Sequence, residues 1–369
     1  PRDRTQLGAS NATLLMLVRN SELSDALHSI RQIEDRFNRH YRYPWTFLND
    51  EEFTEEFRLY TSIMVSGEVR YGRVDGEEWG RGEGVREESV RMGMERLEQE
   101  GVVYARSESY RNMCRWFAGR FMWHEAVRGF EWYWRVEPNI RYPCDLLYDP
   151  FDFLSTHHKS FSFTITLPDY PSTLRSLLPT LQSFFRLHPT LLHPNATTSL
   201  LPFILENPEL RLSPTPGPNT TTSPLTFLLH PSTTPTYCHF WSNFELGPLS
   251  FFRSASYTAL FAFLDATGNF HHERWGDAPV HTAAVATLLG AQEVHFWEDM
   301  GYWHSPLGRC PWDEESWGNG RCAGCEWVGE GSADWGGGSG GCLKRWWETV
   351  GMGGWWEEFS RFEGELGGL

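Results

Sequence analysis

The first 75 residues repeat one pattern of hydrophobic and polar positions. An apolar run at residues 11 to 20 predicts a buried strand, and short runs at 43 to 50 and 67 to 74 predict two more. Between the first two runs, apolar side chains recur at helical spacing, as Leu23, Leu27, Ile30, Ile33 and Phe37. Residues 51 to 63 predict a second helix. Because strands that alternate with helices build parallel sheets, the pattern predicts an open α/β sandwich.

Polar residues stand where the first two predicted strands end. They are Arg19 and Asn20 after the first strand, and Asn49 and Asp50 after the second. Ligands of open α/β sheets bind at the carboxyl ends of the strands, so this edge is where a nucleotide is expected. The sequence contains no G-x-G-x-x-G and no P-loop, so no phosphate-binding motif identifies the nucleotide.

The later part of the chain is less regular. Residues 171 to 192 predict a Leu-rich helix after Pro171, and the Pro-, Thr- and Ser-rich stretch from 207 to 236 predicts an exposed loop. From about residue 310 onward Gly, Trp and Cys dominate, which predicts an irregular segment held by disulfides against the main domain.

Composition narrows the class of protein. The chain has 369 residues, of which 40% are hydrophobic, and this suits a folded globular core. Its formal net charge of -16 opposes a grip on phosphate backbones, so no nucleic-acid partner is expected. The 18 Trp include rings of the kind that cover sugar faces and nucleotide bases, although core packing explains most of them.

Cysteines and sequons indicate an oxidising compartment. Seven Cys accompany glycosylation sequons at Asn11, Asn195 and Asn219. Three disulfides and one thiol are therefore expected, and disulfides are favoured over zinc for Cys322 and Cys325 because no second C-x-x-C is present. No stretch reaches the roughly 20 apolar residues that span a bilayer. Since residue 1 is Pro, we expect a trimmed piece whose anchor or signal lies outside it.

Four segments combine a titratable residue with bulky apolar neighbours, at Glu137, Glu245, Asp277 and His304. Glu137 precedes a proline, which holds the backbone extended and projects the carboxylate from a strand end as a hard ligand for a metal. A histidine among aromatics is more often structural than a metal ligand, and this alternative stays open for His304. For Asp277 the alternative is capping of the helix that follows it.

Seven blocks of sequence together carry a resemblance to one family. They are LVRNSEL, YPWTFLND, YRNMCRWFAGRF, YWRVEPNIRYPCD, YCHFWSNFELGPLSFFRS, ERWGDAPVH and GYWHSP. In order and local spacing, over about residues 8 to 311, the chain resembles the fungal Golgi α-1,2-mannosyltransferase family. The resemblance implies a GT-A-like mixed α/β sheet flanked by helices with a Rossmann-like nucleotide-binding half. It also implies GDP-mannose as donor, Mn²⁺ as cofactor and retention of the α configuration.

The resemblance also implies roles for the metal-binding and catalytic candidates. Glu137 and His304 would hold Mn²⁺ against the GDP diphosphate. Glu245 would lie beneath the sugar, either attacking the anomeric carbon or stabilising an oxocarbenium-like centre. Asp277 would bind the acceptor sugar or remove its proton.

Four further residues match blocks that would bind the donor. Tyr110 and Asn243 would position the diphosphate and the mannose, while Arg19 and Asn20 would contact the guanosine. Ordinary loop polarity is the alternative for the last two.

By this resemblance, residues 1 to 309 form the catalytic domain, with donor binding at about 8 to 150 and acceptor binding and catalysis at about 151 to 309. The Cys-rich segment 310 to 369 packs on the same domain. The expected acceptor is a mannose-terminated N- or O-linked glycan of a glycoprotein in the Golgi lumen, with a membrane anchor N-terminal to this chain. Mannosylphosphate transfer or its regulation, and a catalytically inactive mannan-binding relative, remain the alternatives.

Overall fold

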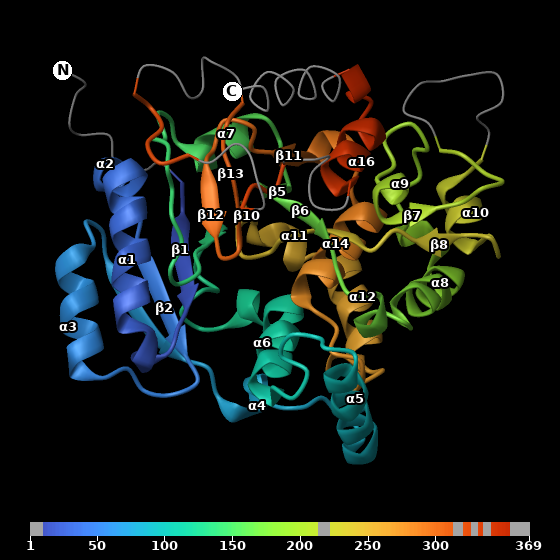
Figure 1. Cartoon of the computed structure of the whole chain (residues 1–369), viewed down its shortest axis with the longest axis horizontal. Coiled ribbons are helices and arrows are strands. Elements are labelled where there is room, and N and C mark those ends of the chain that lie inside the picture. The colour runs from blue at the N-terminus through green and yellow to red at the C-terminus, as the bar shows by residue number, and fades with distance from the viewer. Residues whose placement is uncertain (1–9, 213–221, 313–319, 326–330, 335–340, 355–369) are drawn as a thin grey trace.

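A seven-stranded sheet forms the centre of the protein, in a computed structural model that describes residues 10–212, 222–312, 320–325, 331–334 and 341–354 (Figure 1). The strand order is β11-β5-β10-β4-β1-β2-β3. The strands are β1 (Ala12–Leu17), β2 (Trp45–Asn49), β3 (Val69–Arg73), β4 (Trp132–Arg135), β5 (Phe161–Phe163), β10 (Glu245–Pro248) and β11 (Val294–Phe296). The three strands predicted from the first 75 residues are therefore present.

Strand direction divides the sheet into two parts. Strands β4, β1, β2 and β3 are parallel to one another, as in a Rossmann-like half, whereas β10 runs antiparallel to both β4 and β5. Strand β11 is parallel to β5. The mixed α/β sheet predicted for the family is confirmed. Since the sheet is continuous, it joins strands from the first 150 residues to strands from the later part of the chain.

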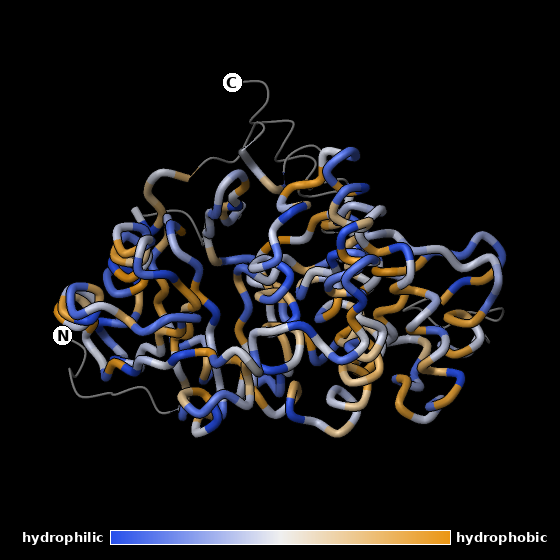
Figure 2. Tube along the Cα trace, turned by 90° about the horizontal axis from the view of Figure 1, so that it is seen from below, coloured by the Kyte–Doolittle hydropathy of each residue, from blue (hydrophilic) through white to orange (hydrophobic). Residues whose placement is uncertain are grey.

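Both faces of the sheet are buried because side chains alternate along each strand. Leu14 and Trp134 belong to a core cluster with residues of helices α1 and α3, whereas Leu15 and Tyr133 belong to a second cluster with α6, α8, α12 and α14. Figure 2 shows hydrophobic residues distributed through both ends of the elongated molecule. The helices are α1 (Leu23–Ile33), α3 (Glu55–Met64), α6 (Glu108–Gly119), α8 (Leu177–Leu187), α12 (Ala255–Asp265) and α14 (Asp277–Leu288).

The chain path creates a switch point between β1 and β4. From β1 the chain moves outward to β2 and β3, then returns to the other side of β1 as β4. Connections from neighbouring parallel strands therefore leave in opposite directions there, which opens a crevice at the strand ends. The shorter helices α4 (Gly76–Trp79) and α5 (Glu87–Gln99) belong to the return connection, and Figure 1 shows them below the sheet.

Two expectations for the middle of the chain were partly wrong. The Leu-rich helix predicted at 171 to 192 is α8 alone, flanked by 3-10 turns at Pro171–Thr173 and Pro189–Leu191. The predicted loop at 207 to 236 contains helix α10 (Pro224–Leu229) and the short strand β8 (Thr234–Pro235). Helix α10 begins there because Ser223 accepts a hydrogen bond from the Thr226 amide and Pro224 occupies the first helical position. Residues 213–221 of that stretch lie outside the described part.

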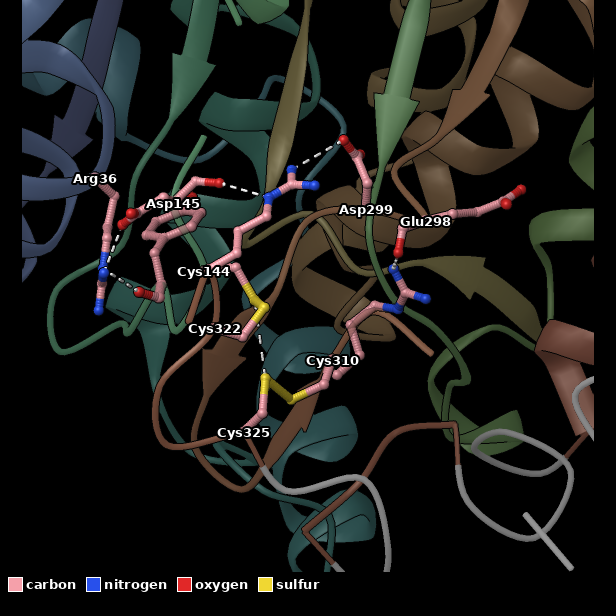
Figure 3. The surroundings of a disulfide bond; sticks show 11 residues. Arg36, Cys144, Asp145, Glu298, Asp299, Cys310, Cys322 and Cys325 are labelled. Carbon is pink, nitrogen blue, oxygen red and sulfur yellow. Dashed lines mark hydrogen bonds and ion pairs between the residues drawn. A yellow bond between two sulfur atoms is a disulfide. The ribbon is translucent and has the colours of Figure 1, made fainter. Parts of the chain in front are cut away.

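Three disulfides and one buried thiol confirm the predicted cysteine count. The pairs are Cys144–Cys322, Cys238–Cys342 and Cys310–Cys325, and Cys114 is the thiol. The two members of the C-x-x-C therefore bond to different partners, as Figure 3 shows. The Cys238 disulfide attaches helix α16 (Cys342–Thr349) to the small sheet of β6 (Thr166–Pro168) and β9 (Cys238–Phe240).

The chain that follows β11 returns to the sheet as a hairpin. It consists of β12 (Tyr302–His304) and β13 (Leu307–Arg309), so the predicted strand and loop before His304 end in a second strand. Among the described residues, no helix is long and apolar enough to cross a membrane.

Candidate active site

A cavity of about 660 Å³ lies at the carboxyl ends of the parallel strands. The segments that follow β1, β2 and β4 line it, as the crevice at the switch point requires. Six of the eight residues predicted for the site border this cavity: Arg19, Tyr110, Glu137, Asn243, Asp277 and His304. Asn20 and Glu245 do not border it.

Arg135 links two of the predicted carboxylates. It is the last residue of β4, and its side chain, 5% exposed, lies on the same face of the extended chain as Glu137. Its Nε donates to Glu137 Oε1 at 2.6 Å, and its Nη1 donates to Asp277 Oδ2 at 2.5 Å. The guanidinium also lies 3.7 Å from the centroid of the Phe117 ring. One buried cation therefore fixes both carboxylates at the edge of the cavity.

Asp277 begins helix α14, and Gly276 occupies the N-cap position. Its Oδ2 also accepts a hydrogen bond from Ser242 Oγ at 2.7 Å, so the carboxylate serves Arg135 and Ser242 and the capping alternative is not what the structure shows. Burial alone would raise the pKa of Asp277, but the charge of Arg135, followed by that of His281 and the Ser242 hydrogen bond, lowers it below its usual value. Asp277 is therefore an ionised acceptor at neutral pH.

His304 and Glu137 border the same cavity and offer the atoms that a divalent metal needs. His304 Nδ1 lies 3.1 Å from the carbonyl oxygen of Ser305, and a carbonyl only accepts, so Nδ1 carries the proton and Nε2 keeps its lone pair. The ring packs edge-on against Trp241 with centroids 5.5 Å apart. On Glu137, Arg135 occupies Oε1 and leaves Oε2 for another partner. One imidazole nitrogen and one carboxylate oxygen suit Mn²⁺.

Glu245 is buried beside the cavity instead of bordering it. It begins β10 directly opposite Arg135, and 1% of its surface is exposed. Tyr133 donates a short hydrogen bond to Oε1, and His281 Nδ1 lies 2.7 Å from Oε2. His281 Nε2 donates to the Phe117 carbonyl at 3.0 Å. Both carboxylate oxygens are therefore already hydrogen-bonded.

The proton between His281 and Glu245 follows from these contacts. Because the Phe117 carbonyl only accepts, His281 Nε2 is protonated, and the second ring nitrogen shares a further proton with Glu245. Burial alone lowers the pKa of His281, but the Glu245 carboxylate raises it above the usual value. The imidazolium form is thus favoured beside the carboxylate.

Arg19 and Asn20 have different surroundings although they are neighbours. Arg19 borders the cavity and its Nη2 donates to Ser109 Oγ at 2.7 Å. Asn20 instead holds the loop before α3, since its Nδ2 donates to the Glu52 carbonyl and its Oδ1 accepts from the Thr54 amide. The structure brings Arg19, and not Asn20, to the cavity.

Asn243 and Tyr110 border the cavity from opposite sides. The Asn243 carboxamide is buried, and neither Nδ2 nor Oδ1 has a hydrogen-bond partner in the described part of the chain. An unpaired buried amide is costly, so a ligand that completes it is favoured. The Tyr110 ring stacks on Tyr104 with centroids 4.6 Å apart, and the Arg274 guanidinium lies 5.3 Å from its centroid.

Three residues of the buried network were not singled out from the sequence. They are Arg135, Ser242 and His281. Spacing offered a signal for two of them: Arg135 is two residues before Glu137 on a strand, and His281 is four residues after Asp277 on a helix, so each pair shares a face. For Ser242 the sequence gave no such signal.

A mixed α/β sheet with a metal-suited carboxylate and imidazole at its switch point defines a nucleotide-dependent glycosyltransferase. The chain belongs to the glycolipid 2-α-mannosyltransferase family, whose model matches residues 2–351, and this confirms the family predicted from the sequence.

Individual relatives agree with this assignment. The chain is 39% identical over 304 residues to the O-glycoside α-1,2-mannosyltransferase omh1 of Schizosaccharomyces pombe, covering 82% of this chain and 71% of the relative. Core-mannan synthase A from Aspergillus fumigatus, solved in a Mn/GDP form, superposes with a TM-score of 0.80 at 33% identity, covering 95% of this chain and 89% of that one. The mannosyltransferase Ktr4p from S. cerevisiae, in complex with GDP, gives a TM-score of 0.77 at 30% identity over 92% and 82% of the two chains.

Proposed function

We propose that this protein transfers mannose from GDP-mannose, with retention, in α-1,2 linkage to mannose-terminated N- or O-linked glycans of glycoproteins. The observation that carries the proposal is the placement of Glu137 and His304 on one cavity at the carboxyl ends of β1 and β4. Relatives named as α-1,2-mannosyltransferases and as Mn- and GDP-bound enzymes support the donor and the metal. Three disulfides suit the Golgi lumen, where an anchor outside this chain would hold the protein.

Mn²⁺ would be held by Glu137 and His304, whose free Oε2 and Nε2 atoms fit this ion. When bound, it offsets negative charge on the GDP leaving group. Arg135 assists from the protein side, because its hydrogen bond to Oε1 fixes the rotamer of Glu137. The conserved geometry of the carboxylate then depends on a residue that does not touch the metal.

Asp277 would bind the acceptor sugar. Its carboxylate is ionised and held from one side by Arg135 and Ser242, which leaves Oδ1 to accept a hydrogen bond from an acceptor hydroxyl. The lowered pKa that Arg135 produces makes Asp277 a weak base, so it orients the hydroxyl more effectively than it removes the proton. Asn243 would complete its buried carboxamide with hydroxyls of the donor mannose.

For Glu245 the proposal favours electrostatic stabilisation of an oxocarbenium-like centre. A nucleophilic carboxylate would first have to release either Tyr133 or His281, because each carboxylate oxygen is already bonded. A fixed, buried negative charge acts on a developing cation without that cost. Glu245→Gln is therefore expected to lower kcat about 100-fold or more without forming a glycosyl-enzyme in the wild type. A trapped sugar on Glu245 in mass spectrometry would contradict this assignment.

The metal site is tested by titration calorimetry of GDP into the protein with Mn²⁺ and then with a chelator. Wild type is expected to bind GDP more tightly with Mn²⁺, and His304→Ala and Glu137→Gln to lose that difference. His40→Ala is the matched control, since His40 is exposed on the short helix after α1 and does not border the cavity. Manganese-dependent binding that survives in both site variants would refute the proposed ligands.

Product analysis separates the proposed reaction from its alternatives. Incubation with GDP-mannose and methyl α-mannoside is expected to yield an α-1,2-linked disaccharide. Release of a phosphodiester would identify mannosylphosphate transfer. Binding of GDP without turnover of any mannoside would identify a catalytically inactive relative.

A further inference from the structure

A second cavity, of about 730 Å³, lies on the opposite side of α6 from the active site. Tyr110, Met113 and Phe117, spaced by three and four residues, border the active-site cavity from one face of the helix. Arg115 and Gly119 are offset from them by about half a turn and border the second cavity, which we call the α6–α12 cavity. Helix α12 forms its other wall.

The α6–α12 cavity combines an exposed indole with planar charged groups. Trp123 is 51% exposed at its edge. Within it, Asp265 accepts two hydrogen bonds from Arg115, at 2.6 and 2.7 Å. Arg120 is less satisfied: its Nη2 lies 3.6 Å from Asp265, and its Nε is buried with no hydrogen-bond partner among the described residues. The guanidinium of Arg120 therefore has donors for a ligand.

The charges of the lining select against most ligand classes. Glu78, Glu83 and Asp265 oppose two guanidinia, so the cavity is slightly acidic within a chain of net charge -16. Phosphates and nucleotides are disfavoured by that charge, and a purely apolar ligand would leave the ionic groups unpaired. A neutral ligand rich in hydroxyls can accept from Arg120, donate to the carboxylates and place an apolar face on Trp123.

We propose that the α6–α12 cavity binds mannose residues of a longer acceptor glycan, away from the sugar that receives the new mannose. This inference rests on the proposed function, because that function supplies an oligosaccharide that can reach both sides of α6. A ligand in this cavity adds binding energy that is the same in the ground state and the transition state. It should therefore lower KM for long acceptors and leave kcat unchanged.

The test compares a short acceptor, methyl α-mannoside, with a long one, an α-1,2-linked mannotetraose, in wild type and Trp123→Ala. Loss of the stacking ring is expected to raise KM for the tetraose about tenfold, with kcat and the KM for methyl α-mannoside unchanged. Trp123→Phe should recover part of the loss. Tyr60→Ala is the control, because Tyr60 is 47% exposed on α3 and lies outside both cavities.

Calorimetry of mannotetraose in the presence of GDP and Mn²⁺ tests the cavity without turnover, and Trp123→Ala should weaken that binding by the same factor. If wild type binds the tetraose at Trp123 but does not turn over GDP-mannose, the proposed function fails and the cavity assignment stands. Equal effects on long and short acceptors, or none on either, would overturn the assignment. Equal weakening with a deglycosylated acceptor protein would identify a polypeptide as the occupant and also overturn it.

Discussion

Replacing Asp277 by Asn tests the buried network that organises the site. The substitution keeps the shape of the side chain and removes its charge, so Arg135, which is 5% exposed, keeps only Glu137 as an anionic partner at hydrogen-bond distance. Removing one partner of a buried ion pair costs about 3 to 5 kcal/mol, and the remaining Glu137 contact places the expected loss of unfolding free energy near the lower bound, about 3 kcal/mol. Ser242→Ala, which removes one neutral donor from the same carboxylate, should cost about 1 kcal/mol.

Urea unfolding followed by tryptophan fluorescence measures these losses, with the slope against urea checked for constancy. The pair is isolated by a double-mutant cycle of Asp277→Asn and Arg135→Met, in which the double variant should lose at least 1 kcal/mol less than the sum of the single losses. Glu95→Gln is the surface control, since its exposed ion pair with Arg91 is worth less than about 0.5 kcal/mol. Losses in the cycle that add within about 0.5 kcal/mol would show that Asp277 and Arg135 do not depend on each other, and would refute the reasoning.

Three further predictions follow from pKa shifts and a disulfide. The Glu245 carboxylate raises the pKa of His281 against the effect of burial, so the stabilisation is complete below the unfolded pKa near 6.5 and is lost as pH rises through the folded value; His281→Gln should flatten the fall of unfolding free energy between about pH 6.5 and 9, and an unchanged slope would contradict it. Burial, followed by neighbouring cations, lowers the pKa of His271 to about 4, so stability should fall as pH decreases from about 6.5 to 4, and His271→Asn should make that fall shallower in acid unfolding titrations. The Cys238–Cys342 disulfide spans 104 residues, so replacing both cysteines by Ser should lower the unfolding free energy by about 4 kcal/mol in urea, and a loss under about 1 kcal/mol would show that α16 contributes little to the core.

Much of the first half of the fold could be predicted from the sequence because its signals are local. Apolar runs of strand length gave β1, β2 and β3, and 3.6-residue spacing gave α1. The Leu-rich segment failed as one helix because the prolines at its two ends favour separate short turns, and apolar spacing does not record them as breaks. The strand β8 failed for a different reason: its two residues are a strand only through pairing with β7 (Leu205–Glu206), a partner about 28 residues away.

For the candidate site, the sequence by itself determined which residues carry the chemistry: a carboxylate held extended before Pro138, a histidine among aromatics, and acidic residues in distinctive blocks. Only the tertiary structure decided their surroundings. It placed Arg135 between Glu137 and Asp277, turned Asn20 away from the cavity, and enclosed Glu245 between Tyr133 and His281. The physical reason is that charge state and ligand access depend on contacts between residues more than 100 positions apart, and those contacts exist only once β10 and α14 have packed against β4.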